Sequence, residues 1–274
     1  MNYLVYNNQA IPENTFVISS NNRAFCYGDG LFETMIFRER KILYLKDHLL
    51  RLSEGLQQLD IELPASLTEE NISAKVSELA DKNNLLNNAR VKLQVWRKAG
   101  GLVTPESSEA EFMISISELK KSPEVKKIAF MSNEVKLHFN NLSKYKTLNF
   151  LTYIQAGLEK KRRKADEIIL TDEKGNIAEA SSSNIFWSNS DILYTPALET
   201  GCIEGIMRKQ IIRFCASENI KVVEGHFSLA ELQSAELVFT SNVSGLSLIE
   251  NINDKKINTQ YTLYQVIRIG LDLL

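Results

Sequence analysis

The chain has few of the residues that build metal sites and disulfide scaffolds. Three cysteines and three histidines are spread over 274 residues: Cys26, Cys202, Cys215, His48, His138 and His226. No two cysteines form a CxxC pair, their number is odd, and no spacing matches a zinc site. We therefore expect reduced thiols, no disulfide framework and no metal ion.

The chain also lacks long hydrophobic runs and an excess of charge of either sign. No apolar stretch approaches the ~18 residues that a membrane-spanning helix needs, and the N-terminal residues lack the pattern of a signal peptide. The 32 basic and 34 acidic residues give a net charge of −2, which creates no general field for nucleic acid or anionic lipid. We expect a cytoplasmic protein without a nucleic acid or membrane partner.

What is present is the composition of an ordinary globular protein. Hydrophobic residues make up 44% and charged residues 24% of the chain, which excludes a disordered or collagen-like protein. The length allows one large domain or two unequal ones. Residues 118–127 are charged, contain Pro123 and form the best candidate linker. We therefore predict an α+β protein with a domain over residues 1–119 and a larger one over residues 120–274.

The N-terminal part reads as strands, then helices, then strands. Leucines from Leu45 to Leu59 recur at steps of three and four, which predicts one face of a helix. Ser66 and Glu69 have the spacing of a capping box and predict the start of a second helix. The expected strands are residues 2–6, 15–19, a hairpin within 32–45 that turns near residues 38–40, and the alternating runs 89–96 and 111–117.

The C-terminal part is richer in short β-like runs. The expected helices begin near Thr147, begin at Gly205 and cover residues 259–272. Gly175 lies in a four-residue hairpin turn over residues 173–176 and is expected to have a positive φ. The expected strands are residues 128–131, 135–139, 167–171, 177–180, 183–187, 192–195, 221–225 and 236–240.

Lys146 is the first candidate for chemistry. It precedes the predicted helix that carries Leu148, Leu151, Ile154 and Leu158. Most lysines near the start of a helix are simply solvated. A lysine held near the positive end of a helix dipole and partly desolvated instead has a lowered pKa, which a Schiff-base nucleophile needs. The residues alone leave both interpretations open.

Three further positions also leave two interpretations open. Glu179 is either a surface carboxylate or a buried acceptor that holds a partner protonated. Gly205 opens a helix, and the N–H groups of a helix start can bind a phosphate, although many helices start in this way. Arg51 lies off the leucine stripe, where most arginines are solvated and a few bind phosphate bidentately.

The order of these segments carries more information than any one of them. The string NNRAFCYGDGLFET is followed by KDHLLRL, KYKTLN, GNIAEASSSNIFW and YTPALETGCIEGIMR. Over about residues 20 to 245 the chain resembles the class IV, or fold-type IV, aminotransferases that use pyridoxal 5'-phosphate (PLP). The resemblance implies a small N-terminal α/β lobe, a larger C-terminal mixed β lobe, PLP between them, and a homodimer whose partner lobe helps close each site.

The resemblance also implies roles for individual residues. Lys146, in the form K-x-L-N, occupies the Schiff-base position and moves the substrate proton, and Glu179 matches the carboxylate that faces the pyridine nitrogen. Met207 stands where the family often has a hydroxyl residue, so only its main chain is expected to contribute. The implied cofactor-binding residues are Lys146, Arg51, Glu179, Ser183, Asn184, Gly205, Ile206, Met207, Thr240, Ser241 and Asn242.

The substrate is less clear, because the group includes branched-chain aminotransferases, D-amino acid aminotransferases and aminodeoxychorismate lyases. Leu151 stands where branched-chain enzymes have a tyrosine. Leu102 and Thr104 stand where D-amino acid enzymes bind the substrate carboxylate. Gly100 and Gly101 match a lyase loop, although lyases often have an arginine at the Leu102 position. Thr34 aligns with a threonine implicated in the lyase and is a third expected catalytic residue.

Three functions therefore follow from the resemblance. The first is transfer of an amino group between an amino acid and a 2-oxo acid. The alternative is lysis of aminodeoxychorismate to p-aminobenzoate and pyruvate for folate synthesis, and a third is PLP binding without turnover. The expected substrate-binding residues are Phe32, Arg97 and Leu102, with Arg97 or Lys98 replacing the missing arginine.

Overall fold

The computed structural model describes residues 2–257 and 262–272. By their contacts these residues form two compact units. Unit 1 comprises the described residues up to Lys120 together with Tyr145–Phe150, and unit 2 comprises Lys121–Lys144 and the described residues from Leu151 onward. The segment that contains Lys146 therefore packs with unit 1, whereas the sequence placed it in the C-terminal domain.

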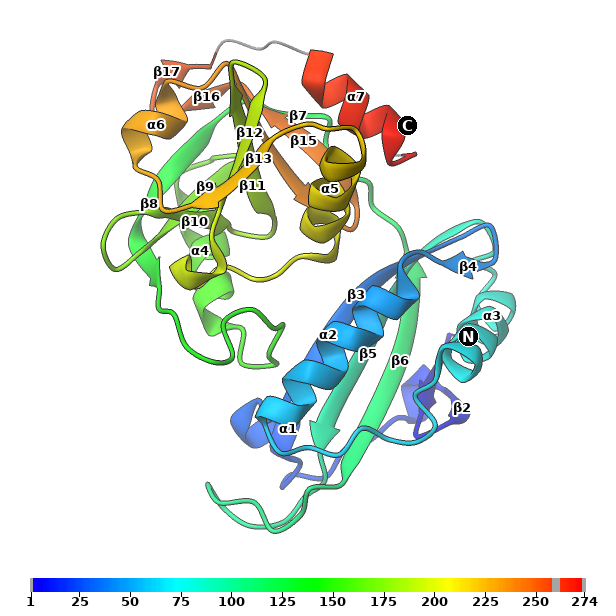
Figure 1. The fold of residues 1–274 in the computed structure, drawn as a ribbon. Coiled ribbons are helices and arrows are strands. Elements are labelled where there is room, and N and C mark those ends of the chain that lie inside the picture. The colour runs from blue at the N-terminus through cyan, green and yellow to red at the C-terminus, as the bar shows by residue number, and fades with distance from the viewer. Residues whose placement is uncertain (1, 258–261, 273–274) are drawn as a thin grey trace. The chain divides into compact units, whose positions relative to one another are not determined.

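Unit 1 is one antiparallel sheet with helices (Figure 1). The strand order is β2-β1-β6-β5-β3-β4. The strands are β1 (Tyr3–Tyr6), β2 (Gln9–Pro12), β3 (Gly30–Arg38), β4 (Lys41–Ile42), β5 (Asn88–Arg97) and β6 (Ala110–Glu118). The helices are α1 (Arg23–Tyr27), α2 (Leu45–Gln58) and α3 (Glu69–Lys82), preceded by a 3-10 turn over Glu13–Thr15.

The two faces of this sheet differ because side chains alternate along β3 and β5. Leu31, Glu33 and Met35 pair with Val95, Leu93 and Val91, and all six are buried on the face that α2 covers. Phe32, Thr34 and Lys92 point to the opposite face and are half-buried. The alternation predicted for residues 89–96 is therefore confirmed, and the half-buried face carries two of the expected site residues.

Unit 2 contains two mixed sheets. One has the order β10-β9-β8-β16-β17 and the other β13-β12-β11-β14-β15-β7. Its strands are β7 (Val125–Lys126), β8 (Ala129–Leu137), β9 (Glu167–Asp172), β10 (Ile177–Ala180), β11 (Asn184–Asn189), β12 (Ile192–Pro196), β13 (Val222–Gly225), β14 (Leu237–Asn242), β15 (Gly245–Ile249), β16 (Asn251–Ile252) and β17 (Lys255–Lys256). Its helices are α4 (Leu151–Arg162), α5 (Ile206–Ser217), α6 (Leu229–Gln233) and α7 (Thr262–Gly270), with a 3-10 turn over Leu198–Thr200.

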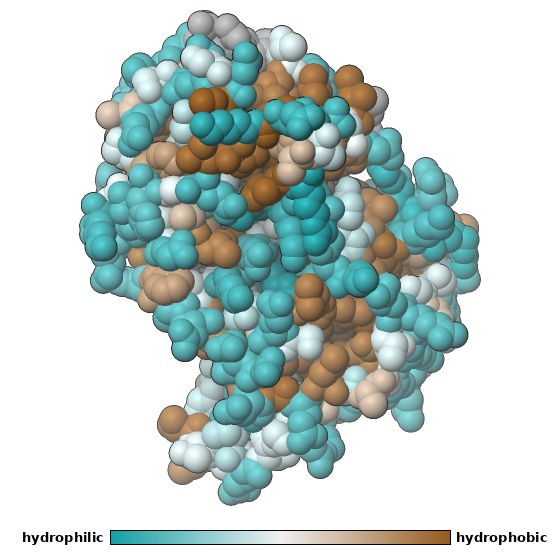
Figure 2. Space-filling model, viewed as in Figure 1, coloured by the Kyte–Doolittle hydropathy of each residue, from teal (hydrophilic) through white to brown (hydrophobic). Residues whose placement is uncertain are grey.

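Both sheets contribute to one core cluster, which includes Ile169 of β9, Ile185 of β11 and Val238 of β14. A second cluster around Ile168, Leu170 and Ala156 lies where α4 packs on β8 and β9. On the visible surface, hydrophobic residues gather in a few patches among a hydrophilic majority (Figure 2). No helix in residues 2–257 or 262–272 is long and apolar enough to span a membrane.

The structure corrects several expected elements. Residues 15–19 form no strand, and Val17 there is 84% exposed. The cap of α3 is Thr68, whose hydroxyl accepts from the Asn71 N–H at 3.2 Å, rather than Ser66. The runs 128–131 and 135–139 are one strand, β8, with an irregular register. Of the last predicted helix, residues 259–261 lie outside the described residues, and α7 ends at Gly270.

The helix expected to begin near Thr147 is also corrected, because α4 begins at Leu151. Its apolar stripe is turned outward, since Leu151, Ile154 and Leu158 are 66%, 53% and 49% exposed. The inward face instead carries Tyr153 and Ala156, which belong to the cluster on β8 and β9. Periodicity therefore identified a helix, but its apolar stripe does not face the interior of unit 2.

Candidate functional site

The backbone of the Lys146 segment is held by the edge of β3. The Phe32 N–H donates to the Lys146 carbonyl at 2.8 Å, and the Leu148 N–H donates to the Gly30 carbonyl at 2.9 Å. Gly28, at φ +65°, comes so close to this segment that a Cβ atom would lie 2.9 Å from the Asn149 nitrogen. Lys146 is thus positioned by backbone pairing with β3 and does not lie at the start of a helix, contrary to the prediction from the sequence.

The Lys146 side chain lies against aromatic rings. Its Nζ is 4.9 Å from the ring centroid of Phe32 and 5.3 Å from that of Phe150. The Nζ of Lys92 lies 5.0 Å from the same Phe32 ring. Burial, followed by the charge of Arg90, lowers the pKa of Lys92. Thr34 is the pairing partner of Lys92, so these residues gather on the half-buried face of unit 1.

On the covered face, Arg51 belongs to a buried ion cluster. Its Nε donates to Oε1 of Glu33 at 2.8 Å and its Nη2 to Oε2 at 2.5 Å, while Nδ1 of His48 lies 2.7 Å from Oε2. Burial alone would raise the pKa of Glu33, but the Arg51 charge and the contacts with His48 lower it to about 2. Glu33 therefore stays ionised and fixes the orientation of Arg51.

Arg97 does not resemble a substrate ligand in this structure. It is buried and donates to Asp29, to the carbonyls of Asp60 and Ser107, and to that of Leu59. These bonds use four of the five guanidinium hydrogens of Arg97. They account for its burial and give the side chain a structural role.

Lys98 is paired with Glu109 at the surface. Leu102 is 79% exposed in a loop that Arg23 holds through the carbonyls of Gly100, Leu102 and Val103. Neither Arg97 nor Lys98 supports the expected replacement for a carboxylate-binding arginine.

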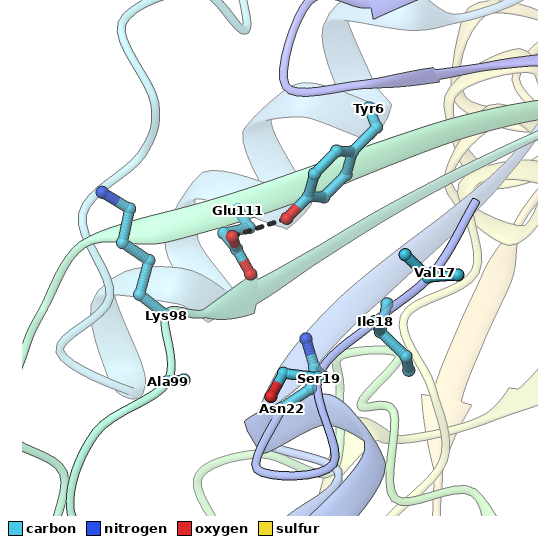
Figure 3. A pocket seen from close by; sticks show the side chains of 8 residues that line it. All are labelled: Tyr6, Val17, Ile18, Ser19, Asn22, Lys98, Ala99 and Glu111. Atoms are coloured by element: carbon cyan, nitrogen blue, oxygen red, sulfur yellow. Dashed lines mark hydrogen bonds between the residues drawn. The ribbon is translucent and has the colours of Figure 1, made fainter. Parts of the chain in front are cut away.

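A pocket of about 290 Å³ lies elsewhere in unit 1 (Figure 3). Tyr6 and Glu111 point toward one another inside it, with a hydrogen bond of 2.6 Å, and Val17 and Ile18 lie on the side away from Lys98 in this view. Burial and Glu111 raise the pKa of Tyr6 to about 12. The pocket contains none of the expected catalytic or cofactor residues.

In unit 2, Glu179 is a buried acceptor on β10 with an exposed fraction of 3%. The Tyr153 hydroxyl donates to its Oε1 at 2.5 Å, and the Ile203 N–H donates to the same oxygen at 3.3 Å. Nδ2 of Asn184 donates to Oε2 at 3.4 Å. Burial, followed by the charge of Glu179, raises the pKa of Tyr153 well above its ordinary value and that of Cys202 to about 12.

The start of α5 lies beside these residues and has the features of an anion site. Gly205 caps the helix, and a Cβ atom there would lie 2.0 Å from Oδ1 of Asn184. Ser241 pairs with Asn184 across β11 and β14, and its buried hydroxyl has no hydrogen-bond partner among the described residues. N–H groups at a helix start and an unsatisfied hydroxyl suit a phosphate.

The remaining expected residues lie around this helix start. Ile206 and Met207 form the buried first turn of α5. Nδ2 of Asn242 donates to the Ser183 hydroxyl at 3.1 Å. Unit 2 therefore brings together the expected residues Glu179, Ser183, Asn184, Gly205, Ile206, Met207, Ser241 and Asn242.

Sequence reasoning missed Tyr153, Lys92 and Glu33. Tyr153 follows Lys146 by seven residues and lies on a helix that was predicted from its leucines and isoleucine alone. Lys92 and Glu33 lie in the predicted strand 89–96 and the predicted hairpin 32–45, and nothing in the local pattern marks either as a site residue. In the part of the chain that the structure describes, no three His, Cys, Asp or Glu side chains form a metal-binding group.

Comparisons with known proteins place the chain among related sequences and folds. The chain is 28% identical over 266 residues to the aminodeoxychorismate lyase of Bacillus subtilis, covering 92% of this chain and 86% of that one. The branched-chain aminotransferase from Thermoproteus uzoniensis with norvaline has a TM-score of 0.90 at 21% identity, covering 99% of this chain and 94% of that one. The T.th. branched-chain amino acid aminotransferase with pyridoxamine 5'-phosphate has a TM-score of 0.87 at 22% identity, with coverage of 99% and 93%.

These structural matches confirm the expected fold-type IV architecture. The family model for amino-transferase class IV matches residues 30–252, which is more than half of the chain. The chain therefore belongs to the class IV aminotransferase family.

Proposed function

We propose that this protein is a PLP-dependent aminotransferase that moves an amino group between an amino acid and a 2-oxo acid. Asn184 carries the proposal, because one end of its side chain contacts Glu179 and the other faces Gly205 at the start of α5. A buried carboxylate and an anion site thus stand one side chain apart. PLP carries both a ring nitrogen that can be protonated and a phosphate, which are the groups that these two features suit.

The residues present fit this cofactor. The buried Ser241 hydroxyl, which lacks a partner in the described part of the chain, and the helix start at Gly205 would hold the phosphate. Glu179 would face the ring nitrogen and favour its protonated form. Arg51 is proposed as a further phosphate ligand from the family resemblance, since Glu33 gives its guanidinium a fixed orientation.

When bound, PLP withdraws electrons from the substrate Cα and makes its proton removable. Lys146 would hold the cofactor through its side-chain amine. As a free amine, its Nζ would act as a general base and then as an acid, and would move the proton taken from the substrate Cα. Phe32 and Phe150 lie beside Nζ and limit its hydration.

For the substrate carboxylate, Lys92 is the better candidate than Arg97 or Lys98. Its Nζ and that of Lys146 share the Phe32 ring, whereas Arg97 is occupied by carbonyl groups and Lys98 by Glu109. Thr34 lies on the same sheet face and is proposed to contact the substrate as well. Leu102 remains a proposed substrate contact from the resemblance.

Lysis of aminodeoxychorismate is a second candidate. The lyase relative at 28% identity and the position of Thr34 beside Lys92 favour it. The two activities differ in the fate of the electrons at Cα, which accept a proton in transamination and expel pyruvate in lysis. Release of p-aminobenzoate without a 2-oxo acid acceptor would identify the lyase.

We also propose a homodimer, following the family resemblance. The exposed Leu151, Ile154 and Leu158 of α4 support a covered surface, because apolar side chains at this spacing are unusual on an isolated helix face. Sedimentation of the purified protein would give twice the chain mass of 31.1 kDa; a single-chain mass would contradict the dimer.

Lys146→Ala tests the proposal most directly. The purified protein is mixed with PLP, reduced with borohydride and digested, and the cofactor mass is expected on the peptide that contains Lys146. Lys146→Ala should lose this mass and about 10⁴-fold of its turnover, because a general base is removed along with the attachment point. Lys174→Ala, in an exposed turn, is the matched control.

The wild-type protein is then screened with L- and D-amino acids, with 2-oxo acids and with aminodeoxychorismate. If the cofactor is trapped on the protein but none of these substrates is converted, the protein is a PLP carrier and not an enzyme of this kind. Cofactor trapped equally well in Lys146→Ala would reject the assignment of Lys146.

A further inference from the structure

Tyr153 is a half-buried titratable side chain that the proposed reaction does not use. It lies in the first turn of α4 and packs on the cluster formed by β8, β9 and their neighbours. The helix turns this tyrosine inward while Leu151 and Ile154 point outward. An inward tyrosine on a helix with outward leucines needs a polar partner for its hydroxyl.

That partner is Glu179. The Tyr153 hydroxyl donates to Oε1 at 2.5 Å, a much shorter distance than those from the Ile203 N–H at 3.3 Å and the Asn184 amide at 3.4 Å. A hydrogen bond from a hydroxyl to a carboxylate is charge-assisted and strong at this length. Tyr153 is therefore the principal donor among these three, and it fixes the rotation of the carboxylate.

The direction of donation has a chemical consequence. The raised pKa of Tyr153, which burial and Glu179 cause, means that the phenol keeps its proton and donates it at any pH near neutrality. A donor to a carboxylate stabilises the ionised form over the protonated form. A carboxylate held in this way has a lower affinity for a proton. A proton shared with a facing ring nitrogen therefore stays on the nitrogen.

We propose that Tyr153 is a positioning residue that acts through Glu179 to keep the cofactor ring nitrogen protonated. This inference rests on the proposed function, because it assumes that Glu179 faces that nitrogen. Without the hydroxyl, the shared proton moves from the ring nitrogen toward Oε2 or Oε1 of Glu179, and the ring becomes a weaker electron acceptor. No other bond is made or broken.

The test uses the PLP-loaded protein with Tyr153→Phe, which removes one hydroxyl and keeps the ring. The ring nitrogen is observed directly with ¹⁵N-labelled PLP, whose chemical shift separates the protonated from the neutral form. We expect a shift toward the neutral form, a fall in kcat of roughly tenfold to a hundredfold, and a KM within about twofold of wild type. Tyr264→Phe is the matched control, because it removes a buried hydroxyl that donates to the Leu246 carbonyl at 3.3 Å.

A double-mutant cycle with Glu179→Gln separates positioning from general damage. If Tyr153 acts through Glu179, Tyr153→Phe should change kcat by less than about twofold in the Glu179→Gln background. An undiminished effect there, or an unchanged ¹⁵N shift in Tyr153→Phe, would overturn the inference. Failure of the wild-type protein to retain PLP on Lys146 after reduction would instead overturn the proposed function itself.

Discussion

Glu33 of unit 1 and Glu179 of unit 2 are both buried carboxylates, exposed by 2% and 3%, but they are held by different partners. Glu33 receives a side-on pair of bonds from the guanidinium of Arg51 and a contact from His48. Glu179 receives bonds from the Tyr153 hydroxyl, the Asn184 amide and the Ile203 N–H, none of which carries a charge. The partners of Glu33 include the cation Arg51, whereas these three donors to Glu179 are neutral groups.

The difference separates a structural carboxylate from one prepared for a ligand. An ion pair such as Glu33–Arg51 compensates the burial of both charges and orients the arginine. A neutral donor orients an ionised carboxylate without bringing a charge of its own, so such a carboxylate can also attract a cation. A protonated ring nitrogen is such a cation. The comparison therefore predicts that changes at Glu33 affect folding and that changes at Glu179 affect chemistry.

The largest effect is expected from Glu33→Gln. The amide removes the carboxylate that Arg51 binds and leaves a buried guanidinium next to a neutral group, which costs about 3 to 5 kcal/mol. Denaturant unfolding followed by circular dichroism measures this loss. The surface pair Arg40–Asp81 provides the control, since Asp81→Asn removes the same kind of contact in water and should leave the unfolding midpoint unchanged. Equal losses in both variants would contradict a special role for burial.

Glu179→Gln should show the opposite pattern. The amide keeps the size of the side chain but no longer favours a protonated ring nitrogen, so we expect kcat to fall by about 10² to 10³-fold. The free energy of unfolding of the protein without cofactor should change much less than in Glu33→Gln, because neutral donors can also bind an amide oxygen. Steady-state kinetics and unfolding on the same preparations test both halves. A variant that lost PLP affinity with an unchanged kcat would exclude the electronic role.

Much of this molecule could be predicted from the sequence where local pattern decides the structure. Alternation identified β5, leucine spacing identified α2, and Gly175 has the expected positive φ of 85° in its hairpin. The family segments led to the correct fold. The strand, the helix and the hairpin turn depend on residues that are close together in the chain, so the local sequence is enough to predict them.

The parts that could not be predicted depend on distant partners. Phe32 holds Lys146 and Gly30 holds Leu148, and both partners lie more than a hundred residues earlier in the chain. The backbone pairing that precedes the start of α4 at Leu151 therefore left no local trace in the sequence. Arg97 is buried because carbonyls at residues 59, 60 and 107 converge on it. Periodicity also cannot tell which face of a helix meets a sheet, so Tyr153 was overlooked as the partner of Glu179.

Lowering the pH should protonate Glu33 and thereby lower the free energy of unfolding of the protein. The pKa of Glu33 is lowered from 4.5 to about 2 in the folded protein. Its stabilising contribution is therefore present above pH 4.5 and is lost as the pH falls from about 4.5 to 2, a difference of about 3 kcal/mol. The gap in unfolding free energy between wild type and Glu33→Gln should be constant above pH 5 and shrink below it. A gap that does not change with pH would show that the carboxylate charge contributes nothing.

The smallest expected effect has an unusual sign. The Ser241 hydroxyl is buried and has no hydrogen-bond partner within the described ranges, and burying such a group costs about 1 to 3 kcal/mol. Ser241→Ala should therefore leave the protein without cofactor equally stable or about 1 kcal/mol more stable, while PLP affinity falls by about tenfold because one phosphate contact is lost.

Ser247→Ala on the neighbouring strand is the matched opposite. Its hydroxyl donates to the Pro123 carbonyl at 2.6 Å, so removing it should cost about 1 kcal/mol of stability and leave PLP affinity unchanged. Unfolding without cofactor and equilibrium binding of PLP distinguish the two variants. Of the two serines, only Ser241 should weaken PLP binding when it is replaced, because only its hydroxyl lacks a hydrogen-bond partner among the described residues. If both variants change stability alone, the Ser241 hydroxyl does not bind the phosphate, and the anion site of unit 2 is formed by the start of α5 without it.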